Sequence, residues 1–220
     1  MNEAGAASAG RKGRKILLQL ILGAICGSVG MFAALTFFEG RSGAQVSPVH
    51  AVALGTALVF GLMGLFVGLG TLAPSVGARA LNVEDRGEIE EQRTMLITGA
   101  VSFLLVAALV GVLAGLGSAD QPGLIGTSIA APIAGVAVLG LIVWSFINRK
   151  LGDEMMRAAA KDAGVAATNL IFLVFGVWAG AAHLGLVPMF EPLAFVAGFF
   201  LLYLLAVFIA VGRRGLLSPR

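Results

Sequence analysis

The densest group of chemically reactive side chains is the run NVEDRGEIEEQR, residues 82–93, which holds five carboxylates and two arginines. Glu84, Glu88 and Glu91 follow the spacing i, i+4 and i+7, so a helix would place them on one face with Asp85 beside them. Clustered carboxylates suit Mg²⁺ or Ca²⁺, and an acidic face also suits docking of a partner. A solvated helix face is the favoured interpretation, because no rigid cage of ligands accompanies the carboxylates.

A second charged stretch, residues 148–164, has the same layout, with Asp153, Glu154 and Arg157 near its start. Both stretches lie between long apolar runs. We therefore interpret them as acidic helical stems that stand out from a membrane, and as a candidate docking surface for a partner.

Three further polar residues could contribute chemistry. His50 and His183 are both expected at the outer ends of apolar runs, so a shared metal or haem site stays open beside simple interfacial hydrogen bonding. Asn169 lies within an apolar run, where a carboxamide favours a hydrogen bond to another helix.

Sequence motifs typical of catalysis are missing from the chain. It has no G-x-S-x-G run and no glycine-rich phosphate loop with a lysine. The single cysteine, Cys26, excludes an internal disulfide. We predict no catalytic residue, no bound cofactor or metal, no nucleic-acid partner and no enzymatic activity.

Apolar runs determine the class of the protein. Of 220 residues, 58% are hydrophobic and only 12% are charged, and the mean hydropathy is +0.96. About 20 consecutive apolar residues suffice to cross a bilayer as a helix. We predict an all-α polytopic membrane protein, a bundle of six transmembrane helices in three in-out-in hairpins, with spans at about 16–38, 51–73, 95–117, 124–147, 165–187 and 193–212.

Basic residues set the predicted orientation. In the six-span layout, 14 Lys and Arg residues fall on one side and only Arg41 on the other. Such asymmetry marks the cytoplasmic side. We expect a disordered basic tail at 1–15, a single transmembrane domain at 16–212, a short tail at 213–220, both termini in the cytoplasm, and a location in the inner membrane.

Glycine pairs at G-x-x-x-G spacing recur in four spans and let helices approach closely. The eight residues are Gly23, Gly27, Gly64, Gly68, Gly111, Gly115, Gly176 and Gly180. They predict a compact bundle, without showing whether the partner helix belongs to the same chain.

Apolar spans without Asp, Glu, Lys or Arg argue against a proton-coupled machine. The favoured function is a non-enzymatic accessory, scaffold or assembly component in contact with the lipid bilayer and with other membrane proteins or further copies of itself. The alternatives are a small transporter or channel for a neutral or apolar solute, and a metal- or haem-binding protein that uses the two histidines.

Overall fold

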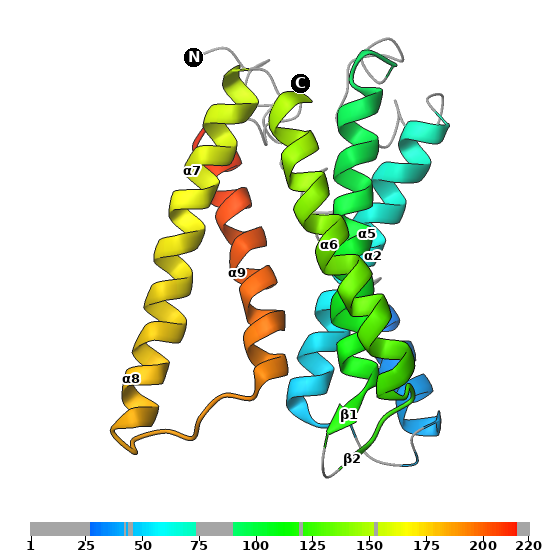
Figure 1. Cartoon of the computed structure of the whole chain (residues 1–220), viewed down its shortest axis with the longest axis vertical. Coiled ribbons are helices and arrows are strands. Elements are labelled where there is room, and N and C mark those ends of the chain that lie inside the picture. Colours follow the sequence, from blue (N-terminus) through cyan, green and yellow to red (C-terminus); the bar gives the residue numbers. More distant parts are fainter. Residues whose placement is uncertain are drawn as a thin grey trace, which may run out of the picture.

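Six helical stretches dominate the computed structural model, which describes residues 27–41, 43, 46–73, 90–118, 121–151 and 154–214 (Figure 1). The first is residues 27–41. It is followed by α2 (Pro48–Leu72), α5 (Arg93–Gly115) and α6 (Thr127–Leu151). A long helix then comprises α7 (Glu154–Ile171), the π-helical turn η1 (Phe172–Gly176) and α8 (Val177–His183), and α9 (Pro192–Arg213) completes the bundle. Two-residue strands, β1 (Gly117–Ser118) and β2 (Gln121–Pro122), pair in the turn between α5 and α6.

Five of these helices are long and apolar enough to cross a membrane: Pro48–Leu72, Arg93–Gly115, Thr127–Ile147, Glu154–His183 and Pro192–Arg213. This confirms the all-helical class and five apolar spans. The predicted span 16–38 lies partly outside the described residues, which show it as helix only from residue 27. The sixth span therefore stays a prediction.

Local sequence explains where several helices begin and end. Ser47 caps α2 by accepting a hydrogen bond from the backbone N–H of His50 (3.3 Å), and Pro48 occupies the first turn, where its missing N–H costs nothing. Pro192 begins α9 in the same way. After α8, Gly185 adopts a φ of 73°, and the N–H of Leu186 bonds to the carbonyl of Ala181. This arrangement ends the helix, because glycine adopts a left-handed conformation without a steric penalty.

Small residues hold α2 and α5 together as antiparallel neighbours. A Cβ atom built at Gly61 would lie 3.6 Å from that of Ala107, and one at Gly68 would lie 3.6 Å from that of Ala100. The packing is tightest at Gly64, where an added Cβ would lie 2.8 Å from Cγ of Leu104 and 3.0 Å from the backbone oxygen of Ala100. The backbones approach this closely because the facing positions carry little or no side chain.

The centre of the core lies where α2, α5 and α9 meet. The Phe60 ring packs edge-on against Phe103 of α5 and Phe200 of α9, with centroids 5.9 Å and 6.0 Å away. Val110 and Ala197 are fully buried in the same cluster. On the far side of α5, the indole N–H of Trp144 in α6 donates to the carbonyl oxygen of Thr98 at 2.8 Å.

The long helix formed by α7, η1 and α8 packs along α9, and among the described elements α9 is its main neighbour. Ala159, Ala163 and Ala167 form its buried stripe. Phe175 of the π turn covers Gly198 of α9, where an added Cβ would lie 2.7 Å from the ring. Near the end of the long helix, the Trp178 indole N–H donates to the carbonyl of Pro188 at 2.9 Å.

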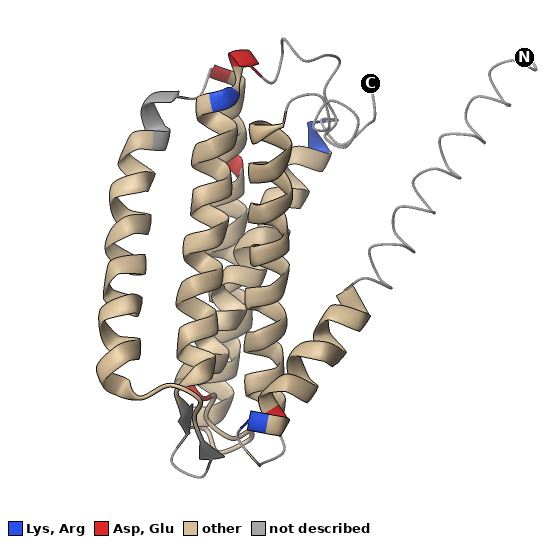
Figure 2. Cartoon of the chain, turned by 90° about the vertical axis from the view of Figure 1, so that its right-hand side faces the viewer, with Lys and Arg blue, Asp and Glu red and all other residues tan. Residues whose placement is uncertain are grey.

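Charged side chains gather toward the two ends of the bundle, and the middle of the helices carries none among the described residues (Figure 2). We call the end at which α5 and α7 begin and α9 ends the basic end. The Lys and Arg side chains that the structure describes there are Arg93, Arg157, Lys161, Arg213 and Arg214. The opposite end carries Arg41 with Glu39 and Glu191.

The predicted glycine pairs fall into two groups. Gly64, Gly68, Gly111 and Gly115 each meet a neighbouring side chain: Leu104, Ala100, Ala57 and Ile125 respectively. Gly27 and Gly180 face open space, and Gly176 meets only Phe172 of its own turn. Gly23 lies outside the described residues.

Candidate functional site

The structure describes the predicted acidic stems only in part. Glu84, Asp85, Glu88 and Asp153 lie outside the described residues. Glu91, Glu154 and Arg157 are exposed at the basic end. The second stem continues directly into a span, because Glu154–His183 is one helix of 30 residues. At about 1.5 Å per residue this is about 45 Å, well beyond a hydrocarbon core of about 30 Å, so its charged first turns can project into water.

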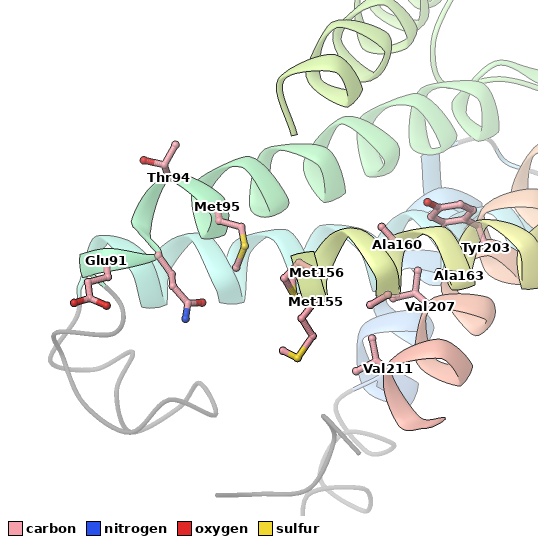
Figure 3. Close-up of a pocket in the computed structure, with 12 residues that line it drawn as sticks. Glu91, Thr94, Met95, Met155, Met156, Ala160, Ala163, Tyr203, Val207 and Val211 are labelled. Atoms are coloured by element: carbon pink, nitrogen blue, oxygen red, sulfur yellow. The ribbon is translucent and has the colours of Figure 1, made fainter. Parts of the chain in front are cut away.

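A pocket of about 770 Å³ opens at the basic end between α5, α7 and α9. Its wall is formed by Glu91, Gln92, Thr94, Met95, Met155, Met156, Ala159, Ala160, Ala163, Tyr203, Val207 and Val211. Glu91 lies at one end of the pocket and Tyr203 at the other, with methionines from α5 and α7 between them (Figure 3). The volume falls in the range of small-molecule sites.

The chemistry of this wall suits a largely apolar molecule with a few hydrogen-bonding groups. Three methionines line it, and their flexible thioethers adapt to ligands of varied shape. The Tyr203 hydroxyl makes no hydrogen bond to any residue that the structure describes, so it is available to a ligand. This pocket was not predicted from the sequence, although Met95, Met155 and Met156 stand close to the two charged stretches and were the available signal.

Asn169 is exposed on the outside of α7. Within the described part of the chain its carboxamide has no hydrogen-bond partner. The neighbouring Thr168 is also exposed, but its hydroxyl donates to the carbonyl of Gly164 in the same helix at 3.0 Å. Asn169 is thus an unpaired polar group in an apolar span, and a hydrogen bond to a helix of this or another chain stays a prediction.

The π-helical turn η1 begins three residues after Asn169, at Phe172. Phe172 is 79% exposed, and the turn contains no buried residue. A π turn inside an α-helix is rare and is frequently found at functional sites. The unpaired amide and the irregular backbone therefore occupy adjacent turns of one exposed helix.

His50 is buried at the opposite end of the bundle, with 3% of its surface exposed. Its Nδ1 lies 2.8 Å from the hydroxyl of Ser47. Its Nε2 is buried without a hydrogen-bond partner among the residues that the structure describes. A metal-binding histidine is oriented in a similar way, with one ring nitrogen hydrogen-bonded and the other directed at the metal. A capping contact at the start of a helix would produce the same arrangement.

His183, at the end of α8, is exposed. Figure 1 separates α8 from α2, with α9 between them. No group of three or more His, Cys, Asp and Glu side chains that could hold a metal ion occurs among the described residues. The structure therefore gives His50 and His183 different surroundings and does not bring them into one site.

Two arrangements in the described chain can support function: the pocket at the basic end and the exposed surface around Asn169. Comparison of the chain with protein-family models, curated proteins and solved structures found no match.

Proposed function

We propose that this chain is a non-enzymatic accessory or assembly component of the inner membrane, which associates with other membrane helices through the outer surface of α7 and α8. The observation that carries the proposal is the carboxamide of Asn169, which lies on an exposed apolar helix and has no hydrogen-bond partner in the described part of the chain. An amide that enters hydrocarbon without a hydrogen bond costs several kcal/mol, about 4–8 on a water-to-alkane scale. Contact with a polar group of a partner removes much of that cost.

The exposure of this helix supports the same conclusion. In its most apolar window only 6% of the residues are buried, against 28% in the corresponding window of α5. Apolar exposure alone is expected next to lipid, which solvates leucine and phenylalanine well. Asn169 is the residue that lipid does not solvate, and so it distinguishes this surface from an ordinary lipid-facing one.

The proposed orientation places the basic end in the cytoplasm, together with both termini. Five described Lys and Arg side chains stand at that end, and Arg41 stands at the other. Basic residues in short connections are retained on the cytoplasmic side. The exposed stem residues Glu154 and Arg157 would then face cytoplasmic partners.

Asn169→Leu tests the proposal, with Thr168→Val as the matched control. Leu keeps the side-chain size and removes the amide, whereas Val removes a hydroxyl that bonds within its own helix. After mild solubilisation of native membranes, the wild-type chain and Thr168→Val should migrate in an assembly larger than one 22.5 kDa chain. Asn169→Leu should reduce that assembly by a factor of about 5 to 30, the range expected for one interhelical hydrogen bond in lipid.

Stability provides the second readout of that experiment. Asn169→Leu should leave the melting temperature of the isolated chain unchanged or raise it, because leucine suits lipid better than an amide. A lower melting temperature would assign Asn169 to the fold of the chain, and a wild-type chain that migrates alone would rule out an assembly role.

A second candidate function, the binding and passage of a neutral or apolar solute, is favoured by the pocket of about 770 Å³. The Tyr203 hydroxyl in its wall has no hydrogen-bond partner among the described residues. Phenol is a suitable probe, because it joins an apolar ring to one hydroxyl. A ligand that binds only the folded state raises the melting temperature. We expect phenol to stabilise the wild type and Ala158→Phe, which lies outside the pocket, but not Ala160→Phe, which fills it. Equal shifts in all three proteins would contradict this function.

A further inference from the structure

The exposed residues around Asn169 follow a regular helical pattern. Val165, Asn169, Phe172, Gly176 and Gly180 are spaced by four, three, four and four residues, and all five are exposed. In a regular α-helix, residues three and four apart lie on the same side, as Val165, Asn169 and Phe172 do. Gly176 ends the π turn and Gly180 follows it, and both are exposed as well. We call this set the Asn169 face.

The depth of Asn169 makes its unpaired amide costly. Asp162 is the last charged residue of the long helix, and Asn169 follows it by seven residues, about 10 Å along the axis. That distance places the side chain well inside a hydrocarbon core of about 30 Å. A carboxamide offers two N–H donors and one acceptor oxygen, and none of them has a partner in the described chain.

We infer that the partner that covers this face is a second copy of the same chain; this inference rests on the proposed function. All copies insert with the same orientation, so two of them can pair symmetrically only about an axis normal to the membrane. Equal residues then meet at equal depth. A carboxamide is complementary to itself in such a pair, because the N–H of each Asn169 can donate to the oxygen of the other.

The rest of the face allows the two helices to approach. A Cβ atom built at Gly180 would find nothing within 4 Å, and one at Gly176 would meet only Phe172 of its own turn. By contrast, Gly64 and Gly198 are already filled by neighbours within the chain. The open glycines therefore leave the backbone at the end of η1 and in α8 accessible to a second helix, as small residues do in membrane dimers.

The α9-facing side of α7 is a different surface. Ala159, Ala163 and Ala167 are buried there, and Phe175 covers Gly198. Pairing through the Asn169 face would leave these contacts intact. The dimer thus needs no rearrangement of the chain.

Cysteine cross-linking in native membranes tests the geometry. In a Cys26→Ser background, which removes the only cysteine, Asn169→Cys is compared with Gly164→Cys. A Cβ atom at Gly164 also meets open space, but five residues turn a helix by about 140° from Asn169. A disulfide needs Cα atoms about 4.4–6.8 Å apart. We expect oxidation to give more covalent dimer of Asn169→Cys than of Gly164→Cys. Equal cross-linking of the two variants, or no cross-linking of either, would overturn the inference.

Dissociation in lipid measures the hydrogen-bond contribution. Two fluorescently labelled pools are mixed in liposomes, and energy transfer is followed as lipid dilutes the protein. We expect Asn169→Leu to weaken the dimer by about 5-fold to 30-fold, equivalent to about 1–2 kcal/mol, and Thr168→Val to leave it unchanged. Equal weakening by both variants, or by neither, would count against Asn169 as the contact.

Two outcomes distinguish failure of the dimer from failure of the proposed assembly role. A different membrane protein that purifies with the wild type in stoichiometric amount, and is lost in Asn169→Leu, would overturn the second copy and leave the assembly role standing. A chain that is monomeric in lipid and has no Asn169-dependent partner would overturn both.

Discussion

Glycine has two different structural roles in this protein, and the surroundings of each residue distinguish them. At Gly64 the absence of a side chain lets α5 approach, because an added Cβ would lie 3.0 Å from the backbone oxygen of Ala100. At Gly99 an added Cβ would meet nothing within 4 Å. Glycines in two adjacent helices, Gly64 and Gly99, therefore contribute differently to stability.

Gly64→Ala should destabilise the bundle by about 1–3 kcal/mol, the cost of forcing extra volume into a packed interface. The relevant contact involves a backbone atom, which cannot move without shifting α5. Gly99→Ala should be neutral or should stabilise by up to about 1 kcal/mol, because alanine has the higher helix propensity. Unfolding of both variants in mixed detergent micelles checks the difference. Equal effects of the two substitutions would contradict the assigned packing.

Polar residues in the spans also differ in their surroundings: some form a hydrogen bond within their own helix and others do not. Thr56, Thr71, Thr98 and Thr168 each donate a hydroxyl to a carbonyl of their own helix, the ordinary solution for a hydroxyl in a helix. A carboxamide has more groups than its own helix can satisfy. Asn169 has no hydrogen-bond partner among the described residues, and it is therefore the residue on which the proposed assembly rests.

At the scale of elements, the long helix of α7, η1 and α8 differs from α5 in having a π turn. Hydrogen bonds in a π turn skip one more residue than in an α-helix. One extra residue therefore fits into the π turn, and α8 keeps nearly the orientation that it would have if that residue were absent. This explains how Ala163 on α7 and Phe175 in the turn can both face α9.

Deletion of Val174, an exposed residue of the π turn, should be tolerated within about 1 kcal/mol, because removing one residue can convert the turn to regular α-helix. Deletion of Val106 from α5 is the control. It should rotate the rest of that helix by about 100° and expose the core, which is a loss of several kcal/mol. Melting temperatures of the two deletions test this, and a deletion of Val174 as damaging as that of Val106 would disprove it.

The ends of the elements add little to stability by comparison. Arg214, the residue that follows α9, donates through Nε to Asp162 in the middle of α7 at 3.1 Å. The side chains of Arg214 and Asp162 are 31% and 56% exposed, so solvent weakens their attraction. Packing of Ala163, Phe175 and Gly198 holds this pair of helices together instead.

At the scale of the whole molecule, two groups of helices meet along α9. One group holds α2, α5 and α6, and the other is the long helix beginning with α7 (Figure 1). Ring contacts connect Phe60 through Phe200, Phe199 and Phe195 to Phe175. The pocket lies between the two groups at the basic end, so its shape depends on how they are held together.

The orientation of the whole bundle is predicted from charge and can be measured by labelling. In the Cys26→Ser background, Met189→Cys lies in the loop between α8 and α9, and Glu154→Cys lies at the basic end. Both positions are exposed. A membrane-impermeant maleimide should label Met189→Cys in intact spheroplasts and Glu154→Cys only after lysis, because basic connections stay in the cytoplasm. Labelling in the reverse order would contradict the predicted topology.

The class of the protein, five of its spans and the clustering of charge at the helix ends could all be predicted from the amino-acid sequence alone. These features are imposed by the bilayer, because an apolar run of sufficient length must cross it and charged groups must stay near water. They depend on each segment separately. The sixth span and the orientation stay predictions of the same kind.

Only the packing of the helices shows which polar and small residues contact a neighbour. The fold placed His50 in a buried position and His183 in an exposed one, left Asn169 unpaired within the described chain, and formed a pocket that no motif predicted. Such outcomes depend on the rotation and register of one helix against another. Many weak contacts between distant residues set these quantities together, so the pattern within a single span does not contain them.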